Sequence, residues 1–208
     1  EVPEQELVDR FLPPVALPQR FDVDNPGYAV PTVTQREFRE YRKLSQEAME
    51  YSLNVIERVD QEFAAVFGQS YGLVEAVDCD DADLVILTTA TITSTARVAL
   101  AELREQGLKV GLFKLRVFRP FPTAAVRAAL DHVPRIAVIE RNISLGREGI
   151  FCSEVKAALV NSPGHPRIQG YLAGLGGSDV NPKLIQRIAH HALESDMVQD
   201  GPIWMAED

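Results

Sequence analysis

Cysteine and long hydrophobic runs are both scarce in this 208-residue chain. The two cysteines, Cys79 and Cys152, lie in unlike contexts without a CxxC spacing, so we expect ordinary thiols rather than a disulfide framework or a metal knuckle. Apolar runs such as LVIL at 84–87 are far shorter than the ~20 residues that a membrane-spanning helix needs. No charged and then apolar leader opens the sequence. We therefore expect a cytoplasmic protein with no membrane segment and no metal site of its own.

Sequence signatures of catalysis are also missing. The stretch TTATITSTA at 88–96 stands where a dinucleotide-binding fold carries its phosphate loop, but it has no glycine, and we interpret it as a hydroxyl-capped turn. The four histidines have neither metal-ligand spacing nor a nearby nucleophile motif. No Ser/His/Asp set and no P-loop is visible. The chain therefore shows no self-contained catalytic machinery.

Positive charge is in the minority, and the net charge of −9 argues against a general nucleic-acid binder. The distribution is uneven, because residues 91–193 hold 14 basic and 7 acidic side chains. The stretches 71–90 and 194–208 each hold 5 acidic and no basic side chains. The excess of basic side chains at 91–193 is explained either by solvated helix faces or by an anionic partner or ligand that this part of the chain faces.

The first third of the chain predicts two segments. Residues 1–35 contain six prolines up to Pro31 and no sustained hydrophobic period, which predicts an extended arm. Residues 36–70 place apolar side chains at a period close to 3.6 and end near Gly68, which predicts a long helical linker. Such a helix is longer than a small domain needs, so we expect part of it to pack against another domain or subunit.

The remainder predicts a three-layer α/β domain over residues 71–195, followed by an acidic tail at 196–208. Apolar strands are expected at 83–90, 109–115, 135–140 and 166–174, and helices at 94–107, 122–133, 148–159 and 182–193. Alternation of strands and helices at this spacing indicates a parallel sheet with helices on both faces.

An unusually polar connection, ERNISLGREG at 140–149, joins the third expected strand to its helix. In parallel α/β sheets, ligands and partners gather at this carboxyl edge, and the first N–H groups of a helix favour anions. Asn142 and Ser144 are suited to bond turn backbone, and Arg141 and Arg147 add positive charge. Gly146 and Gly149 permit a positive φ and the close approach of another chain. The connection is either an anion or interdomain docking loop, or a capped turn with solvated charges.

Several stretches of the sequence, taken in order, resemble one protein family. They are VDRFLPP at 8–14, LKVGLFKLRVFRPFP at 108–122, ERNISLGREG at 140–149 and YLAGLGGSDV at 171–180. Together they resemble the α subunit of 2-oxoacid:ferredoxin oxidoreductases, most closely the pyruvate enzyme. The resemblance covers nearly the whole chain but only the C-terminal half of a usual α subunit. The half that binds the thiamine pyrimidine is missing, so the chain is a split subunit or a fragment.

The resemblance implies a Rossmann-like domain, similar to the C-terminal domain of transketolases and of 2-oxoacid dehydrogenase β subunits. It implies a complex that uses thiamine diphosphate, Mg²⁺ and iron–sulfur clusters to make acyl-CoA, CO2 and reduced ferredoxin. The implied partners are a thiamine-binding β subunit, the other half of α, γ and ferredoxin-like δ subunits, ferredoxin and coenzyme A. No diphosphate-binding signature or cluster-type cysteine set is present, so we expect a non-catalytic scaffold without a cofactor of its own.

Two other functions stay open from the sequence: the equivalent domain of a transketolase or 2-oxoacid dehydrogenase, and a free-standing anion-binding α/β module. Under the leading interpretation, we expect one docking patch at the carboxyl edge of the sheet. Its residues would leave neighbouring strands, with Phe121 as the apolar anchor and arginines as directional donors. The expected patch consists of Arg119, Phe121, Arg141, Asn142, Ser144, Gly146 and Arg147.

Overall fold

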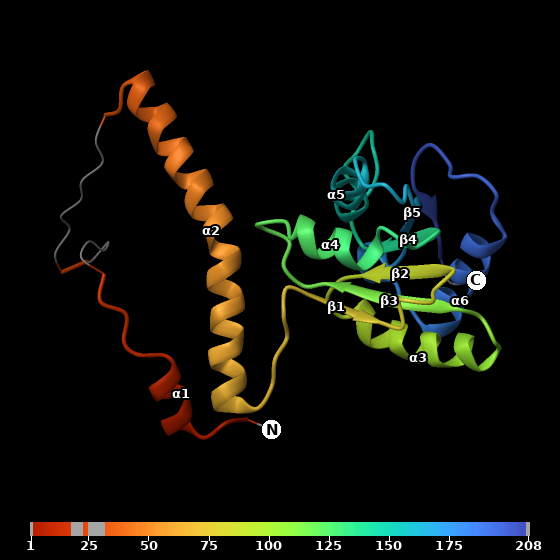
Figure 1. Ribbon diagram of the computed structural model, residues 1–208, viewed down its shortest axis with the longest axis horizontal. Helices are drawn as coiled ribbons and strands as arrows, with labels where there is room; N and C mark the ends of the chain where they lie inside the picture. Colours follow the sequence, from red (N-terminus) through yellow and green to blue (C-terminus); the bar gives the residue numbers. More distant parts are fainter. Residues whose placement is uncertain (1, 18–22, 25–31, 207–208) are drawn as a thin grey trace. The chain divides into compact units, whose positions relative to one another are not determined.

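The computed structural model describes residues 2–17, 23–24 and 32–206, and it divides into two compact units, residues 1–71 and 72–208 (Figure 1). Much of the stretch expected to be an extended arm, at 18–22 and 25–31, lies outside the described residues. No helix in the described part of the chain is long and apolar enough to cross a membrane.

The first unit consists of two helices, α1 (Gln5–Phe11) and α2 (Gln35–Phe67). Thr34 and Glu37 form a capping box at the start of α2, and Gly68 ends it with φ 72°. Phe11 of α1 packs against Phe63 and Phe67, with ring centroids 5.5 and 5.4 Å apart. The expected long helix is therefore present, and the stretch expected to be an extended arm contains a short helix as well.

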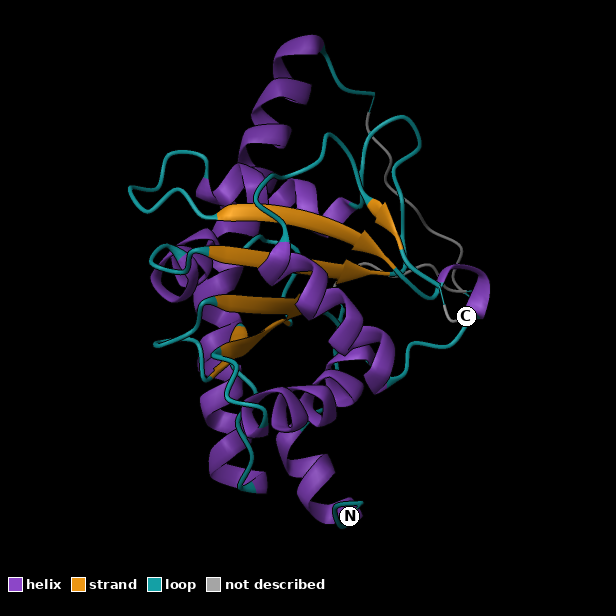
Figure 2. Ribbon diagram, turned by 90° about the vertical axis from the view of Figure 1, so that its right-hand side faces the viewer, coloured by secondary structure: helices purple, strands orange, loops and turns teal. Residues whose placement is uncertain are grey.

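The second unit is a six-stranded sheet with the order β1-β3-β2-β4-β5-β6. Its strands are β1 (Val74–Val77), β2 (Leu84–Thr88), β3 (Val110–Leu115), β4 (Arg135–Glu140), β5 (Arg167–Leu172) and β6 (Ile203–Trp204). All neighbours pair in parallel except β1, which is antiparallel to β3 (Figure 2). The predicted α/β class and the four central parallel strands are confirmed.

Helices cover both faces of this sheet, as Figure 1 shows. One core cluster joins the sheet to α3 (Ile92–Glu105) and α6 (Pro182–Glu194). The other joins it to α4 (Thr123–Leu130) and α5 (Ile150–Leu159). Pro122 was expected inside the first turn of α4 but is its N-cap residue. The three layers follow from strands that are apolar on both faces, such as β2, in which all five residues are buried.

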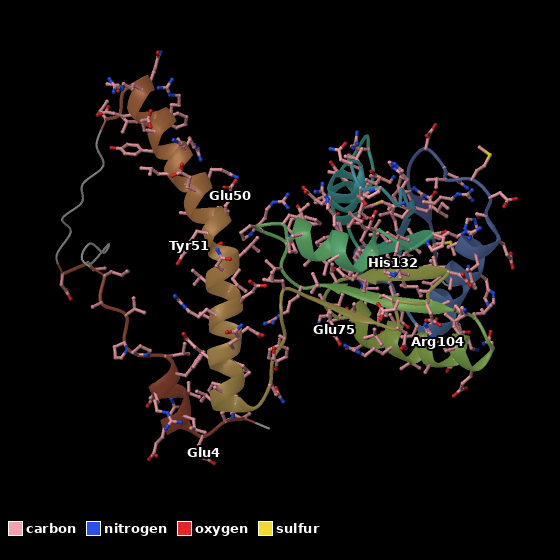
Figure 3. All side chains as sticks on the ribbon, viewed as in Figure 1. Glu4, Glu50, Tyr51, Glu75, Arg104 and His132 are labelled. Carbon is pink, nitrogen blue, oxygen red and sulfur yellow. The ribbon has the colours of Figure 1, made fainter. Side chains whose placement is uncertain are left out.

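The two edge strands were not predicted. β1 has three partly buried residues and one exposed residue and lies next to an acidic run, and β6 has only two residues inside the stretch expected to be an acidic tail. The acidic run before β2 is held by Arg104 of α3, labelled in Figure 3. Its Nη2 donates to the Asp78 carbonyl and to Asp81 Oδ1, both at 2.8 Å, and its Nε donates to the Val110 carbonyl at 2.7 Å. These bonds attach Asp78 and Asp81 of the acidic run to α3.

Candidate docking site at the carboxyl edge of the sheet

Glu140, the last residue of β4, is buried and turns its carboxylate onto the first turn of α5. Oε2 accepts from the Phe151 N–H at 3.0 Å and from Asn142 Nδ2 at 2.8 Å, while Oε1 accepts from the Cys152 N–H at 3.1 Å. Asn142 Oδ1 in turn accepts from the Ile150 N–H at 2.9 Å. The three N–H groups that open α5 therefore have partners within the chain. An anion does sit at this helix N-terminus, and it is the protein's own carboxylate.

The environment of Glu140 combines opposing electrostatic effects. Burial raises the pKa of this carboxyl, while the bonds from Phe151, Cys152 and Asn142 lower it, and the net result is a raised pKa. The neighbouring carboxylate of Glu148 also raises the pKa of Glu140. The bonded geometry nevertheless fixes the end of β4 against α5.

Gly149 makes this arrangement possible. A Cβ at this position would meet Glu140 Oε1 at 1.8 Å and Cδ at 2.0 Å, well inside van der Waals contact. The positive φ expected for Gly149 is not observed, because its backbone has φ −63° and ψ 148°, which any residue adopts. The glycine is therefore required by the close approach of the carboxylate and not by backbone strain.

A second buried carboxylate, Glu148, supports the same turn. Its Oε2 accepts from Lys156 Nζ at 2.6 Å and its Oε1 from Ser153 Oγ at 3.1 Å. Burial alone would raise the pKa of Glu148, but the bond and charge of Lys156 outweigh this effect and the pKa is lowered. The Glu148 carbonyl also accepts from the Ser144 N–H at 2.9 Å, which closes the loop on itself. The polar connection is thus an internally bonded turn with a charged network beneath it.

The predicted site residues of this loop fall into two groups. Asn142 belongs to the internal network described above, while Ser144, Gly146 and Arg147 are exposed. Gly146 has φ 84°, as expected for the turn, and the exposed Leu145 stands beside it. The side chain of Arg141 is exposed too and lies against Gly174, where an added Cβ would be 2.7 Å from Arg141 Nε. Arg141 thus links this loop to the turn that follows β5.

Arg119 lies on the α5 side of the edge. Its Nη2 donates to Glu154 Oε1 at 2.5 Å, and its guanidinium carbon lies 4.1 Å from the centroid of the Phe118 ring. Phe118 packs edge-to-face on Phe151 of α5 at 4.8 Å. Phe121 is half-buried against the core cluster under α4 and α5.

The expectation that Arg119 and Phe121 leave a strand next to the one that leads to Arg141 was wrong. In the observed order β2 lies between β3, which leads to Arg119 and Phe121, and β4, which leads to Arg141. The two segments are instead connected through the first turn of α5, which contacts Phe118 on one side and Glu140 on the other. The helix therefore forms the centre of the site.

The residues that organise this edge were not among the predicted site residues. They are Glu140, Glu148 and Gly149, whose roles depend on α5 folding back over the end of β4. A carboxylate at the end of a buried strand, followed nine residues later by glycine at a helix start, is the sequence signal that points to such a cap. Chemically, the edge offers exposed guanidinium groups and an exposed leucine on a rigid turn, which suits contact with another protein surface.

The mostly parallel sheet, its two helical layers and the polar turn at its carboxyl edge define a doubly wound α/β domain. Residues 82–185 match the family described as pyruvate:ferredoxin oxidoreductase core domain II. The chain belongs to this family.

Two curated relatives resemble nearly all of the chain. The pyruvate synthase subunit PorA of Methanothermobacter thermautotrophicus is 36% identical over 189 residues, which are 90% of this chain and 48% of that protein. The ketoisovalerate oxidoreductase subunit VorA of Pyrococcus abyssi is 39% identical over 187 residues, 89% of this chain and 47% of that protein. The chain thus spans about half the length of these relatives.

Among solved structures, a similar one is the 2-oxoglutarate:ferredoxin oxidoreductase of Magnetococcus marinus, described with 2-oxoglutarate, coenzyme A and succinyl-CoA bound. The similarity has a TM-score of 0.46 and 20% identity, and it covers 64% of this chain and 21% of that one.

Proposed function

We propose that this chain is the non-catalytic scaffold and docking part of a 2-oxoacid:ferredoxin oxidoreductase α subunit. In the complete enzyme, thiamine diphosphate, Mg²⁺ and iron–sulfur clusters belong to other chains or segments. The products are an acyl-CoA, CO2 and reduced ferredoxin. The partners are a thiamine-binding β subunit, the N-terminal half of α, and γ and ferredoxin-like δ subunits, with ferredoxin and coenzyme A as reactants. The family match over 82–185 is the observation that carries this proposal.

The donor groups of this chain do not fit those cofactors. Among the described residues, no cluster of three or more His, Cys, Asp or Glu side chains is placed to hold a metal ion. Both cysteines are buried, and burial raises the pKa of Cys79 to about 11, so thiolate ligation is disfavoured there. The carboxylates nearest to the carboxyl edge, Glu140 and Glu148, are committed to α5 and to Lys156. We therefore assign cofactor chemistry to the rest of the enzyme.

The docking role is supported by the contrast between the buried network and the exposed residues at the carboxyl edge. The network around Glu140 stiffens the turn from within, so its exposed residues are presented in a fixed conformation. Preorganisation of this kind lowers the entropic cost of association. Arg119, Arg141 and Arg147 present guanidinium groups, a residue type enriched at interfaces.

Copurification tests this proposal. The tagged chain, expressed together with its candidate partner chains, should retain a thiamine-binding subunit and a ferredoxin-like subunit. Arg147→Ala should weaken retention, whereas Arg97→Ala, an exposed arginine paired with Glu75, serves as the matched control. Recovery of lipoyl-carrier partners would instead support the 2-oxoacid dehydrogenase alternative. Recovery of the chain alone, with tight binding of nucleotides or coenzyme A, would support a free-standing anion-binding module.

The substrate is a 2-oxoacid, and pyruvate is our first candidate. The ketoisovalerate relative matches the chain at a similar identity, so 2-ketoisovalerate is the second candidate. Comparing kcat/KM for the two acids in the reconstituted complex separates these substrates.

A further inference from the structure

A small cavity of about 20 Å³ lies at the amino edge of the sheet, opposite the docking loop. Arg135 and Arg167, which line it, are the first residues of β4 and β5. His191 and Ser195, from the end of α6, also line it, and the exposed Met197 is part of its wall. The cavity lies wholly within the second unit and shares no residue with the docking site.

The two arginines are unusual neighbours. They are register partners on adjacent parallel strands, so their side chains leave the same face of the sheet. Like charges placed opposite one another repel, and natural sheets avoid such pairs unless something compensates the charge. None of the ion pairs between described residues involves either arginine. Arg167 donates from Nη1 to the Asp196 carbonyl at 3.0 Å, which is a neutral acceptor.

Arg135 adds a second, independent observation. Its Nε is buried and has no hydrogen-bond partner, and it is the one such side-chain atom in the described part of the chain. Native proteins rarely leave a buried donor of this strength unmatched. The cavity that Arg135 lines has room for an acceptor from outside the described chain, either a water molecule or one oxygen of an anion.

The polar groups around the cavity supply further hydrogen bonds. The Tyr171 hydroxyl lies 3.0 Å from His191 Nδ1, and burial raises the pKa of Tyr171 to about 12, so the phenol keeps its proton. The cavity is therefore bordered by the guanidinium groups of Arg135 and Arg167 and by the hydrogen-bonded pair of Tyr171 and His191.

We infer that the cavity formed by Arg135, Arg167 and His191 binds a phosphate group. Paired guanidinium groups match the charge and the planar donor geometry that phosphate oxygens accept. A cavity of about 20 Å³ holds roughly one oxygen-sized group. One phosphate oxygen would enter it, and the others would remain at the solvent-exposed side near Arg167. The phosphate comes either as the free ion or on a small ester.

Calorimetric titration of the full chain with inorganic phosphate, at constant ionic strength, tests the inference. Arg167→Gln is the primary variant because Arg167 is exposed and its replacement spares the core. Arg135→Lys keeps the charge but removes the Nε donor. Arg97→Gln, which makes the same charge change at an exposed arginine of α3 paired with Glu75, is the matched control. We expect millimolar or tighter binding that both site variants weaken at least about tenfold and the control leaves within about twofold.

Several outcomes would overturn the inference. These are no binding heat up to ~20 mM phosphate, equal binding by Arg167→Gln, or loss of binding in the Arg97→Gln control. Equal binding of acetate would show a site for carboxylates, and a loss of thermal stability without a change in phosphate affinity would show that the arginines only support the end of α6. Parallel titration with glycerol 3-phosphate separates the two sources, because a preference for the ester would assign the site to a small phosphate ester.

Discussion

Gly149→Ala should displace the Glu140 carboxylate from the start of α5, because the new Cβ would lie 1.8 Å from Oε1. Glu140 receives bonds at 3.0, 3.1 and 2.8 Å from Phe151, Cys152 and Asn142. Hydrogen bonds to a charged group contribute about 1.5–3 kcal/mol each and are not additive, so we expect a loss of about 2–4 kcal/mol in the free energy of unfolding. For a chain of this size the melting temperature should fall by about 5–15 °C.

A double-mutant cycle separates the clash from a general effect of alanine at this position. In the Glu140→Ala background the carboxylate is gone, so Gly149→Ala should cost less than about 1 kcal/mol. Urea denaturation, followed by circular dichroism and by fluorescence of Trp204, the one tryptophan and a residue of the second unit, provides the free energies. An equal cost of Gly149→Ala in both backgrounds would refute the reasoning, since it would place the effect in the backbone or in another contact.

Three further outcomes follow from the same structure. The lowered pKa of Glu148 means that the folded state binds fewer protons than the unfolded state. Its stabilisation is therefore present above the ordinary pKa of 4.5 and is lost as the pH falls through the lowered pKa, so the ~1.5–3 kcal/mol cost of Glu148→Gln at pH 7 should shrink toward pH 3 in urea titrations. Arg141→Ala should weaken assembly by ~1–3 kcal/mol in a binding assay and leave the melting temperature of the chain nearly unchanged, and an equal loss of stability would show that Arg141 acts as internal packing. Thiamine diphosphate with Mg²⁺ should give no binding heat with the chain alone, and a micromolar site would contradict the scaffold proposal.

The parts of the fold that the sequence predicts well are those governed by local pattern. The continuous apolar runs of β2 and β4 can be buried on both faces only in a covered parallel sheet, and the 3.6 period of α2 ends at a glycine. β1 was missed because its four partly buried or exposed residues show no alternation and an acidic run follows them, and β6 because two residues form no pattern. Edge strands of this kind are specified by the neighbour with which they pair.

The candidate site, like the edge strands, could be predicted only in part from the sequence. The polar residues of ERNISLGREG at the end of a buried strand predicted a site at the carboxyl edge of the sheet, and the loop does lie there. The function of Glu140 could not be read from it, because its partners are backbone N–H groups 11 and 12 residues later in the chain. The order of the strands places β2 between the strands that lead to Arg119 and to Arg141. This order is a property of the whole sheet and cannot be predicted from the local sequence around either arginine.

Reconstituted electron transfer is the most direct measurement of the proposed function. Pyruvate, coenzyme A and a viologen acceptor should give no reduction with this chain alone. They should give sustained reduction when the thiamine-binding β subunit, the N-terminal half of α and the electron-transfer subunits are added, and omission of this chain should abolish it. Turnover by this chain alone above a denatured control, or full activity of the other subunits without it, would contradict a scaffold role in a 2-oxoacid:ferredoxin oxidoreductase.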